Sequence, residues 1–253
     1  MKITRIETIP VRVPLKPEFA IRSGRGGAHT VSPFLLVKVH TDEGLIGIGE
    51  ASCTPRWSGE DQVTGAHLIH TYLEPLLVGE DPSEPEELAK KFRLAFAGNY
   101  FTKAAVEMAL WDIAGKAEGL PLCELLGGKV REFVPTKWSV SGVEPEPAAE
   151  IARWAVAQGF KAMKVKVGIE PDGDVARVRA VRDAAGPDIK LGVDANGGWS
   201  LAQAVATVKR LGEFQIAFAE QPVSPELPEQ LAEVRRAISI PVIADESVFT
   251  LRD

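Results

Sequence analysis

Three short apolar runs in the second half of the chain each lead into an acidic residue at a nearly constant interval. They are Lys190-Leu-Gly-Val-Asp194, Ile216-Ala-Phe-Ala-Glu220 and Pro241-Val-Ile-Ala-Asp245, so the carboxylates lie 26 and then 25 residues apart (194, 220 and 245). That interval is about one strand, one helix and two loops, the length of a βα repeat. Because the carboxyl ends of parallel barrel strands meet at one mouth, the pattern predicts a parallel βα fold in which three carboxylates converge.

Converging carboxylates are candidate metal ligands. Hard oxygen ligands of this kind suit Mg²⁺ or Mn²⁺, with water and substrate oxygens completing the coordination. A single aspartate that closes a strand is often only a helix cap. Three acids in register, one repeat apart, favour a metal site over three unrelated caps. Asn196 lies two residues after Asp194 and Glu246 follows Asp245, so both are candidate partners of the site.

A lysine pair precedes the three acids. The run from Phe160 to Gly168 reads as a strand, in which Lys164 and Lys166 share one face while the apolar residues between them share the other. Two ammonium groups this close disfavour each other's charged form, so we expect their coupled pKa values to be lowered. A lysine brought toward neutrality is a candidate general base. The alternative is an edge strand with two solvated lysines.

Together these residues resemble the enolase superfamily, within it the branch of mandelate racemase and muconate cycloisomerase. The resemblance spans essentially the whole chain and rests on these segments: Lys164-Val-Lys166, Asp194-Ala-Asn196, Glu220-Gln-Pro222, Asp245-Glu246-Ser247, Ala104–Gly115 and Leu125-Leu-Gly-Gly128. A Lys-x-Lys strand is the muconate cycloisomerase-like pattern, shared with dipeptide epimerases, acylamino-acid racemases and o-succinylbenzoate synthases. The segment Trp138-Ser-Val-Ser-Gly142 is more similar to the cycloisomerases than to the epimerases.

The resemblance implies a divalent-metal-dependent isomerase or lyase. It would transfer a proton at the carbon α to a carboxylate through an enediolate, and would be most like muconate cycloisomerase. The alternatives are a dipeptide or N-acylamino-acid epimerase and an o-succinylbenzoate synthase. Superfamily sites of this kind pair a lysine or histidine base with Mg²⁺. The implied residues are Lys166 as acid/base, Lys164 as its electrostatic partner and contact for the substrate carboxylate, the metal ligands Asp194, Glu220 and Asp245, and the supporting residues Asn196 and Glu246.

The two halves of the chain have different patterns, which predicts an α+β capping domain at residues 1–130 and a partial (β/α)₈ barrel of the TIM type at 131–253. In the cap we expect strands at 1–13, 34–40 and 45–49 and helices at 61–77, 84–96 and 102–118. In the barrel we expect five strands near 133–140, 160–168, 190–194, 216–220 and 241–245, with helices near 145–158, 172–185, 201–211 and 228–237.

A glycine-containing stretch from Leu15 to Ser32 interrupts the strand pattern. Glycines permit mobility, so this stretch is either a lid or a plain connector. The resemblance implies a lid that closes over the substrate, and Glu50–Trp57 is a second loop that could face the mouth. The lid candidates are Phe19, Arg22, Arg25, His29 and Trp57.

Composition narrows the functional classes. The formal net charge is −6, which argues against a general nucleic-acid-binding surface. We find no apolar run of the roughly 18 residues that a membrane span needs. Cys53 and Cys123 show no metal-site spacing, which favours a reduced, cytoplasmic setting. The partner that the resemblance implies is a small carboxylate substrate.

A closed barrel of this type needs eight strands, whereas only five are predicted here. We therefore expect a truncated form, lacking the second acid/base that the resemblance implies, and a homo-oligomer when full length. By itself this piece is expected to be inactive and to aggregate or pair through its open edges. The rival interpretation is a non-catalytic, metal-binding fragment or a subunit that requires a partner.

Overall fold

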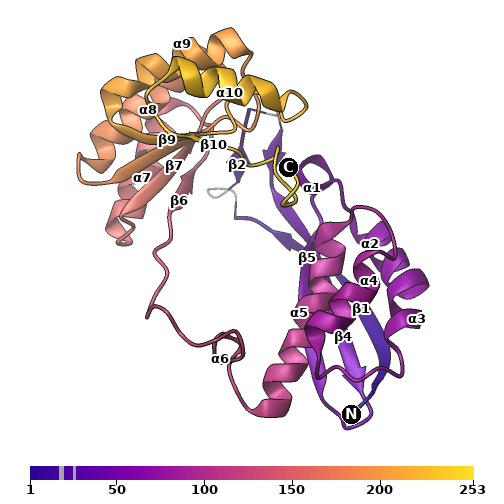
Figure 1. Ribbon diagram of the computed structural model, residues 1–253. Helices are drawn as coiled ribbons and strands as arrows, with labels where there is room; N and C mark the ends of the chain where they lie inside the picture. The colour runs from indigo at the N-terminus through magenta and orange to yellow at the C-terminus, as the bar shows by residue number, and fades with distance from the viewer. Residues whose placement is uncertain (17–19, 25–26) are drawn as a thin grey trace. The chain divides into compact units, whose positions relative to one another are not determined.

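The computed structural model describes residues 1–16, 20–24 and 27–253, so the lid candidates Phe19 and Arg25 lie outside the described residues. The chain forms two compact units, shown in Figure 1. The first comprises Met1–Pro14 and Val31–Phe133, and the second comprises Leu15–Thr30 and Val134–Asp253. The stretch predicted to be a lid is therefore part of the second unit.

The first unit is a three-stranded antiparallel sheet with helices packed against it. The sheet order is β1–β4–β5. Its elements are β1 (Ile3–Pro14), β4 (Val31–Thr41), β5 (Ile46–Ser52), α1 (Pro55–Ser58), α2 (Gln62–Leu68), the π-helical turn η2 (Ile69–Leu73), α3 (Glu74–Leu77), α4 (Pro85–Arg93), α5 (Tyr100–Glu118) and α6 (Leu122–Leu125). The predicted helix at 61–77 is present, but the π-helical turn interrupts its regular hydrogen bonding.

Helix α5 lies directly on strand β5 because the strand carries glycine at the contact points. A Cβ built on Gly49 would come within 1.8 Å of the Ala105 carbonyl oxygen, and one on Gly47 within 1.9 Å of the Ala109 carbonyl oxygen. No side chain fits there, so these two glycines set the helix–sheet distance. Ala105 and Ala109 are fully buried.

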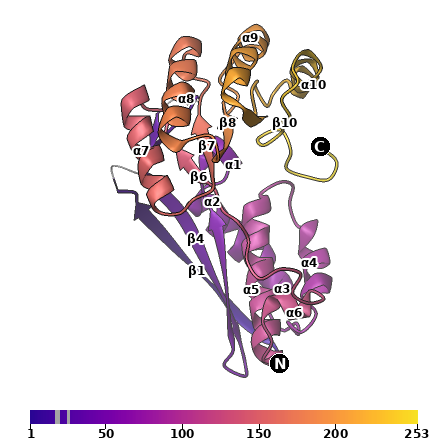
Figure 2. The ribbon, with the colours of Figure 1, turned by 90° about the vertical axis from the view of Figure 1, so that its left-hand side faces the viewer.

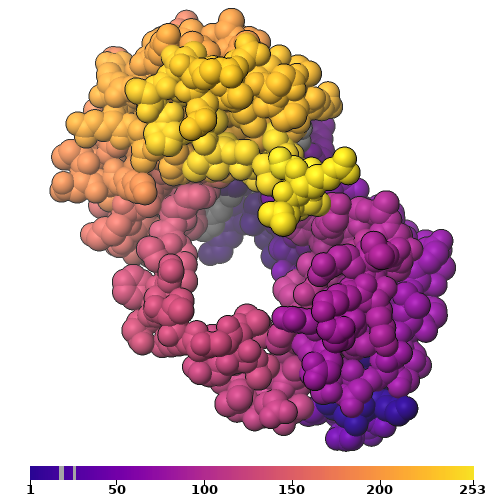
Figure 3. All heavy atoms as spheres, viewed as in Figure 1, coloured from indigo at the N-terminus to yellow at the C-terminus, as the bar shows by residue number. Residues whose placement is uncertain are grey.

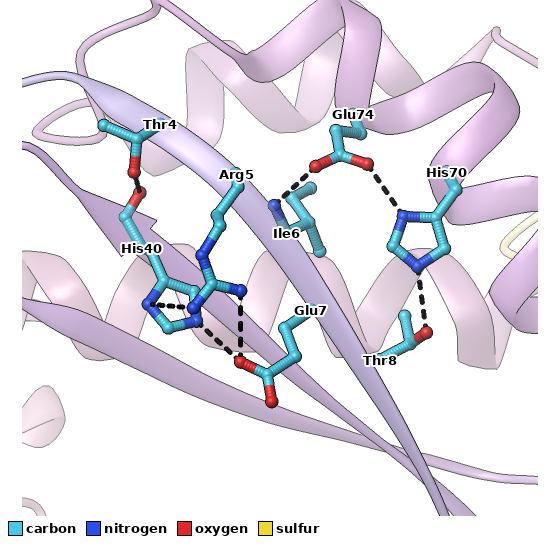
Figure 4. A network of polar contacts seen from close by, with 8 residues as sticks. All are labelled: Thr4, Arg5, Ile6, Glu7, Thr8, His40, His70 and Glu74. Carbon is cyan, nitrogen blue, oxygen red and sulfur yellow. Dashed lines mark hydrogen bonds and ion pairs between the residues drawn. The ribbon is translucent and has the colours of Figure 1, made fainter.

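Polar side chains bind strand β1, which is an edge of this sheet (Figure 4). Glu74 accepts a hydrogen bond from the backbone N–H of Ile6 at 2.7 Å and contacts His70 Nδ1 at 2.7 Å. The other ring nitrogen of His70 lies 2.9 Å from the Thr8 hydroxyl. The exposed edge of β1 is thus partly satisfied by helix side chains, which limits its capacity to pair with another strand.

The second unit contains a five-stranded parallel sheet in the order β10–β9–β8–β7–β6. Its strands are β6 (Trp138–Val140), β7 (Ala162–Lys166), β8 (Lys190–Asp194), β9 (Ile216–Glu220) and β10 (Val242–Ile243), and the short hairpin β2 (Ile21–Arg22) and β3 (Ala28–His29) also belongs to this unit. The intervening helices are α7 (Pro145–Ala157), α8 (Pro171–Ala185), α9 (Leu201–Leu211), the 3₁₀ turn η3 (Gly212–Phe214) and α10 (Pro228–Ala237).

The helices α7 to α10 lie in a row along one face of this sheet, as Figure 2 shows. Buried valine, leucine and alanine side chains from the strands and helices form the core between the two layers. The opposite face of the strands carries the polar residues of the site. Residues beyond β10 lie at the surface of this unit (yellow in Figure 3), where Val248, Phe249 and Leu251 are exposed.

The predicted fold class is confirmed, because an antiparallel sheet with helices is followed by parallel strands that alternate with helices. Three strands are shorter than expected. Residues 133–137 precede β6 without strand pairing, β7 covers 162–166 of the expected 160–168, and β10 ends at Ile243, two residues before Asp245. In the part of the chain that the structure describes, no helix is both long and apolar enough to span a membrane.

Candidate active site

The register of the parallel strands brings the predicted residues into one row. Lys166 lies beside Asp194, and Asp194 lies beside Glu220. Partners in register point to the same face of a sheet, so these three side chains share the face opposite the helices. Asp194 and Glu220 are the last residues of β8 and β9, as the sequence predicts.

Asp245 follows β10 in a loop, and the fully buried Gln221 holds that loop in place. The Gln221 side-chain oxygen accepts a hydrogen bond from the Asp245 backbone N–H at 2.9 Å. Its amide nitrogen donates to the Val223 carbonyl oxygen at 3.0 Å and to the Ser247 hydroxyl at 2.7 Å. Gln221 has a positive φ of 36°, which is uncommon for a residue other than glycine and typical of functional sites. The glutamine of the Glu-Gln-Pro motif therefore connects the end of β9 to Asp245.

Asp194, Glu220 and Asp245 each present a carboxylate oxygen, and these oxygens all lie within 4.8 Å of one another. Asp194 is fully buried and Glu220 is almost so. Burial raises the pKa of Asp245 to about 6, and the charges of Glu246, Glu220 and Asp194 add to this effect. Three like charges so close together repel one another unless a cation or a proton lies between them. The triad therefore fits a divalent cation with hard oxygen ligands.

The two lysines contact this cluster from β7. The ammonium of Lys164 lies 2.9 Å from Asp194 and also binds Glu220. Lys166 Nζ lies 2.7 Å from Asp194 and donates to the Asn196 side-chain oxygen at 2.8 Å. Lys164 is buried, whereas Lys166, two residues nearer the end of the strand, is partly exposed.

The prediction that the lysine pair lowers its own pKa values is wrong for Lys164. Burial acts to lower the pKa of Lys164, but the charges of Asp194 and Glu220 outweigh it, so the pKa is raised. The two ammonium groups in turn hold the pKa of Asp194 below its usual value, although burial raises it. The carboxylates dominate because they are closer to each ammonium than sequence spacing alone could indicate.

Asn196 links the lysine to the acids. Its backbone N–H donates to Asp194 at 2.9 Å, and its side-chain nitrogen donates to Glu246 Oε1 at 2.9 Å. Asn196 has a positive φ of 46°, which turns the chain back over the end of β8. The second carboxylate oxygen of Glu246 is buried and has no hydrogen-bond partner among the described residues.

Lys137 is a third lysine of the site that the sequence prediction missed. It lies one residue before β6, in which Ser139 is beside Lys164 in the sheet register, and its side chain interacts with that of Lys164. Lys137 as a whole is exposed, but partial desolvation of its ammonium lowers its pKa, and the neighbouring Lys164 lowers it further. Alternation along residues 137, 139 and 141 was the signal that could have identified it.

Phe218 forms the layer beneath the carboxylates, on the same face of the sheet. A Cβ built on Gly192 would come within 2.2 Å of the Phe218 ring. Gly192 lies beside Lys164 in the register, so the ring covers the space that a side chain at position 192 would fill.

The described part of the predicted lid is anchored to the end of β6. The backbone N–H of Arg22 donates to the Ser141 hydroxyl at 2.9 Å, and the Arg22 carbonyl accepts from the Gly142 N–H at 2.9 Å. His29 lies on the partner strand β3. Trp57 is in α1 of the first unit, where its ring packs edge-on against Phe101 with a centroid distance of 5.2 Å.

Comparison with known proteins places the chain in a family. Residues 5–127 match the N-terminal domain of the mandelate racemase/muconate lactonizing enzyme family, and residues 146–253 match the family described as enolase C-terminal domain-like. The N-succinyl-L-Arg/Lys racemase of Bacillus cereus is 34% identical over 254 residues, which are 100% of this chain and 68% of that protein. The chain belongs to the mandelate racemase/muconate lactonizing enzyme family.

Members of this family that catalyse different reactions match the chain about equally well. Muconate cycloisomerase 1 of Rhodococcus opacus is 34% identical over 100% of this chain and 68% of its own length. The crystal structure of a dipeptide epimerase from Cytophaga hutchinsonii, complexed with Mg and the dipeptide D-Ala-L-Val, matches with a TM-score of 0.91 and 36% identity, over 98% of this chain and 66% of that one. The chain thus spans about two thirds of the length of these relatives. Their activities confirm the prediction of an isomerase.

Proposed function

We propose that this site transfers a proton at the carbon next to a substrate carboxylate, assisted by a divalent cation. The observation that carries the proposal is the convergence of three carboxylate oxygens within 4.8 Å, in direct contact with two lysines of the neighbouring strand. A structural ion-pair cluster would balance its charges. Here the four acids Asp194, Glu220, Asp245 and Glu246 outnumber the three lysines of the site, and the lysine ion pairs reach only Asp194 and Glu220 among the described residues, which favours an added cation.

In this proposal Asp194, Glu220 and Asp245 hold the cation, and Gln221 keeps Asp245 in place. Mg²⁺ is our choice because carboxylate oxygens are its preferred protein ligands and because the C. hutchinsonii epimerase is described with Mg. Mn²⁺ accepts the same ligands. When bound, the cation supplies positive charge that opposes the second negative charge of an enediolate.

We assign different roles to the two lysines because they differ in burial. Lys166 is the partly exposed member at the end of β7, so we assign it the transfer of the α-proton. Lys164 is buried and holds a raised pKa, so it stays charged and contacts the substrate carboxylate. Asn196 orients Lys166 through its side-chain oxygen, and Glu246 orients Asn196.

Two classes of small carboxylate substrate have support. The Trp138–Gly142 segment and the R. opacus relative favour a muconate cycloisomerase, whereas the Lys-x-Lys strand is shared by both classes. The B. cereus racemase and the C. hutchinsonii epimerase favour racemisation of an N-acylated amino acid or a dipeptide. Both reactions share the step at the α-carbon. We also propose a cytoplasmic location, with which the two free thiols agree, and a homo-oligomer when the protein is full length.

The test is exchange of the substrate α-proton with solvent deuterium, followed by proton NMR in the presence of Mg²⁺. Muconolactone, an N-succinyl amino acid and a dipeptide are each supplied to the chain alone and to the chain fused to the third of the B. cereus racemase that the match does not cover. Exchange of one substrate class that Lys166→Ala abolishes supports the proposal. Exchange at an undiminished rate in Lys166→Ala, or no exchange of any of the three in either protein, contradicts it.

A further inference from the structure

Two buried charged residues outside the proposed site hold the backbone carbonyl of Lys166 and the backbone that follows it. Asp174 is fully buried in the first turn of α8, and Arg177 is buried one turn later. Their side chains form an ion pair with an N–O distance of 2.7 Å. Neither residue contacts a carboxylate of the triad in the hydrogen bonds of the described residues.

Asp174 accepts hydrogen bonds from the backbone N–H groups that follow the last sheet hydrogen bond of β7. The last ladder bond of this strand runs from the Val167 N–H to the Asp194 carbonyl at 2.9 Å. The next two backbone N–H groups, of Gly168 and Ile169, donate to Asp174 Oδ2 at 2.9 and 3.1 Å. A carboxylate in the first turn of a helix is favourably placed for such bonds, because the helix dipole stabilises its charge.

Arg177 holds the carbonyl side of the same segment. Its guanidinium donates to the carbonyl oxygen of Lys166 at 3.3 Å and to the carbonyl oxygen of Val143, which follows β6. The indole N–H of Trp199, which follows β8, donates to Asp174 at 3.1 Å. The ion pair thus joins the loops that follow three neighbouring strands, with Lys166 in the middle one.

A stabilising role alone explains this pair poorly. A buried ion pair is weak evidence for stability, because apolar residues of similar size are often as good or better. The other buried residues of α8 that face the sheet are valines, Val175, Val178 and Val181. The inward charged residues of α8 bind loop backbone groups that lack sheet partners. Asp174 and Arg177 do so next to Lys166, and Arg182 does so at the other end of the helix, where it donates to the carbonyl oxygens of Gly186 and Ile189. A side chain at position 168 could not hold this segment by apolar packing instead, because a Cβ on Gly168 would lie 2.4 Å from the Ala195 carbonyl oxygen.

We propose that Asp174 and Arg177 are positioning residues that fix the Lys166 ammonium for proton transfer. The inference rests on the proposed function for its kinetic consequence, but its structural consequence is independent of it. If the pair holds residues 166–169, its loss displaces the base while leaving the carboxylates of β8 and β9 in place. A displacement of about 1 Å in a reacting group costs on the order of a hundredfold in rate.

The structural test is hydrogen–deuterium exchange at the amides of Gly168 and Ile169. The variants are Asp174→Asn, which removes the charge, and Arg177→Lys, which keeps a positive charge beside Asp174 while giving up the fork that reaches two carbonyls. The matched control is Asp172→Asn, on the same helix turn but exposed and paired with Arg210 at the surface. We expect the two amides to exchange at least about tenfold faster in Asp174→Asn than in the control. Equal exchange rates of these amides in Asp174→Asn and in the control Asp172→Asn overturn the proposal.

The kinetic test uses the substrate and the form of the protein that show α-proton exchange. In Arg177→Lys we expect kcat to fall by about ten- to a hundredfold with KM and the Mn²⁺ dissociation constant changed less than about threefold. A generally damaged fold would change KM and metal affinity as well as kcat, and that result would overturn the positioning role. An unchanged kcat would also overturn it. If the unmodified protein exchanges no substrate, the proposed function fails while the amide exchange experiment still decides this inference.

Discussion

Replacing Asp245 by asparagine should stabilise the cation-free protein, although it removes a proposed ligand. The oxygens of the triad lie within 4.8 Å of one another. Two unit charges at that separation repel by about 3.5 kcal/mol at an effective dielectric constant of about 20. The pKa of Asp245, raised to about 6 from 3.8, corresponds to about 3 kcal/mol of destabilisation when the group is ionised. Because Asp245 is partly exposed and Lys164 opposes the repulsion, we expect about 1–2 kcal/mol to be recovered.

The sign of this effect depends on pH. The pKa of Asp245 is higher in the folded than in the unfolded state, so the folded protein binds the proton more tightly. The cost of ionisation is therefore absent below about pH 4 and complete above about pH 7. Asparagine mimics the protonated acid, so Asp245→Asn should raise Tm by about 2–6 °C at pH 7.5 and have little effect at pH 4.

The assay is thermal unfolding in the presence of EDTA, with Asp188→Asn as an exposed aspartate control. Adding Mg²⁺ should then raise the Tm of the unmodified protein but not that of Asp245→Asn, since binding to the folded state alone is stabilising. A lower Tm for Asp245→Asn in EDTA at pH 7.5, or the same rise at pH 4, would refute the reasoning from charge repulsion.

Three further predictions concern other parts of the structure. Burial raises the pKa of Cys53 to about 11, so a thiol reagent at pH 8 should modify the exposed Cys123 in the native protein and Cys53 only after unfolding. The absorbance of the thiolate that the reagent releases gives the number of modified cysteines. Gly192→Ala should lower the stability of the second unit by about 1–3 kcal/mol in urea unfolding, because its methyl group overlaps the Phe218 ring, and a neutral result would show that the ring has room to move. Cation affinity measured by calorimetry should fall up to tenfold per pH unit below about pH 6, where a proton competes at Asp245, and a flat profile between pH 5 and 7 would contradict this.

The sequence predicted those features of the site that strand periodicity determines. Alternation places Lys164 and Lys166 on one face, and the βα interval places Asp194 and Glu220 at strand ends, where the structure has them. The predicted helix near 201–211 is α9, which Ser200 begins with a capping box. Such local patterns depend on a few residues close in sequence, so they can be predicted without knowing the tertiary contacts of the rest of the chain.

The long-range polar contacts could not be predicted in this way. The bond of Arg22 to Ser141 joins residues 119 apart, and the bond of Gln221 to Ser247 joins residues 26 apart. Nothing in the spacing of Asp174 distinguishes it from the exposed Asp172 on the same turn. The direction of the Lys164 pKa shift was missed for the same reason, because the distances to its carboxylate neighbours depend on strand register. The roles of the site residues and the domain limits at 130/131 stay predictions.

Cation binding by the triad is the claim on which the proposed chemistry depends most directly. Calorimetric titration of the metal-free chain with Mn²⁺ at pH 7.5 measures it without any substrate. We predict one ion per chain, with the dissociation constant raised at least about a hundredfold in each of Asp194→Asn, Glu220→Gln and Asp245→Asn and unchanged in Asp188→Asn. Binding of the same strength in all three variants, or none in the unmodified chain while circular dichroism shows it folded, would contradict the assignment of these carboxylates as a metal site.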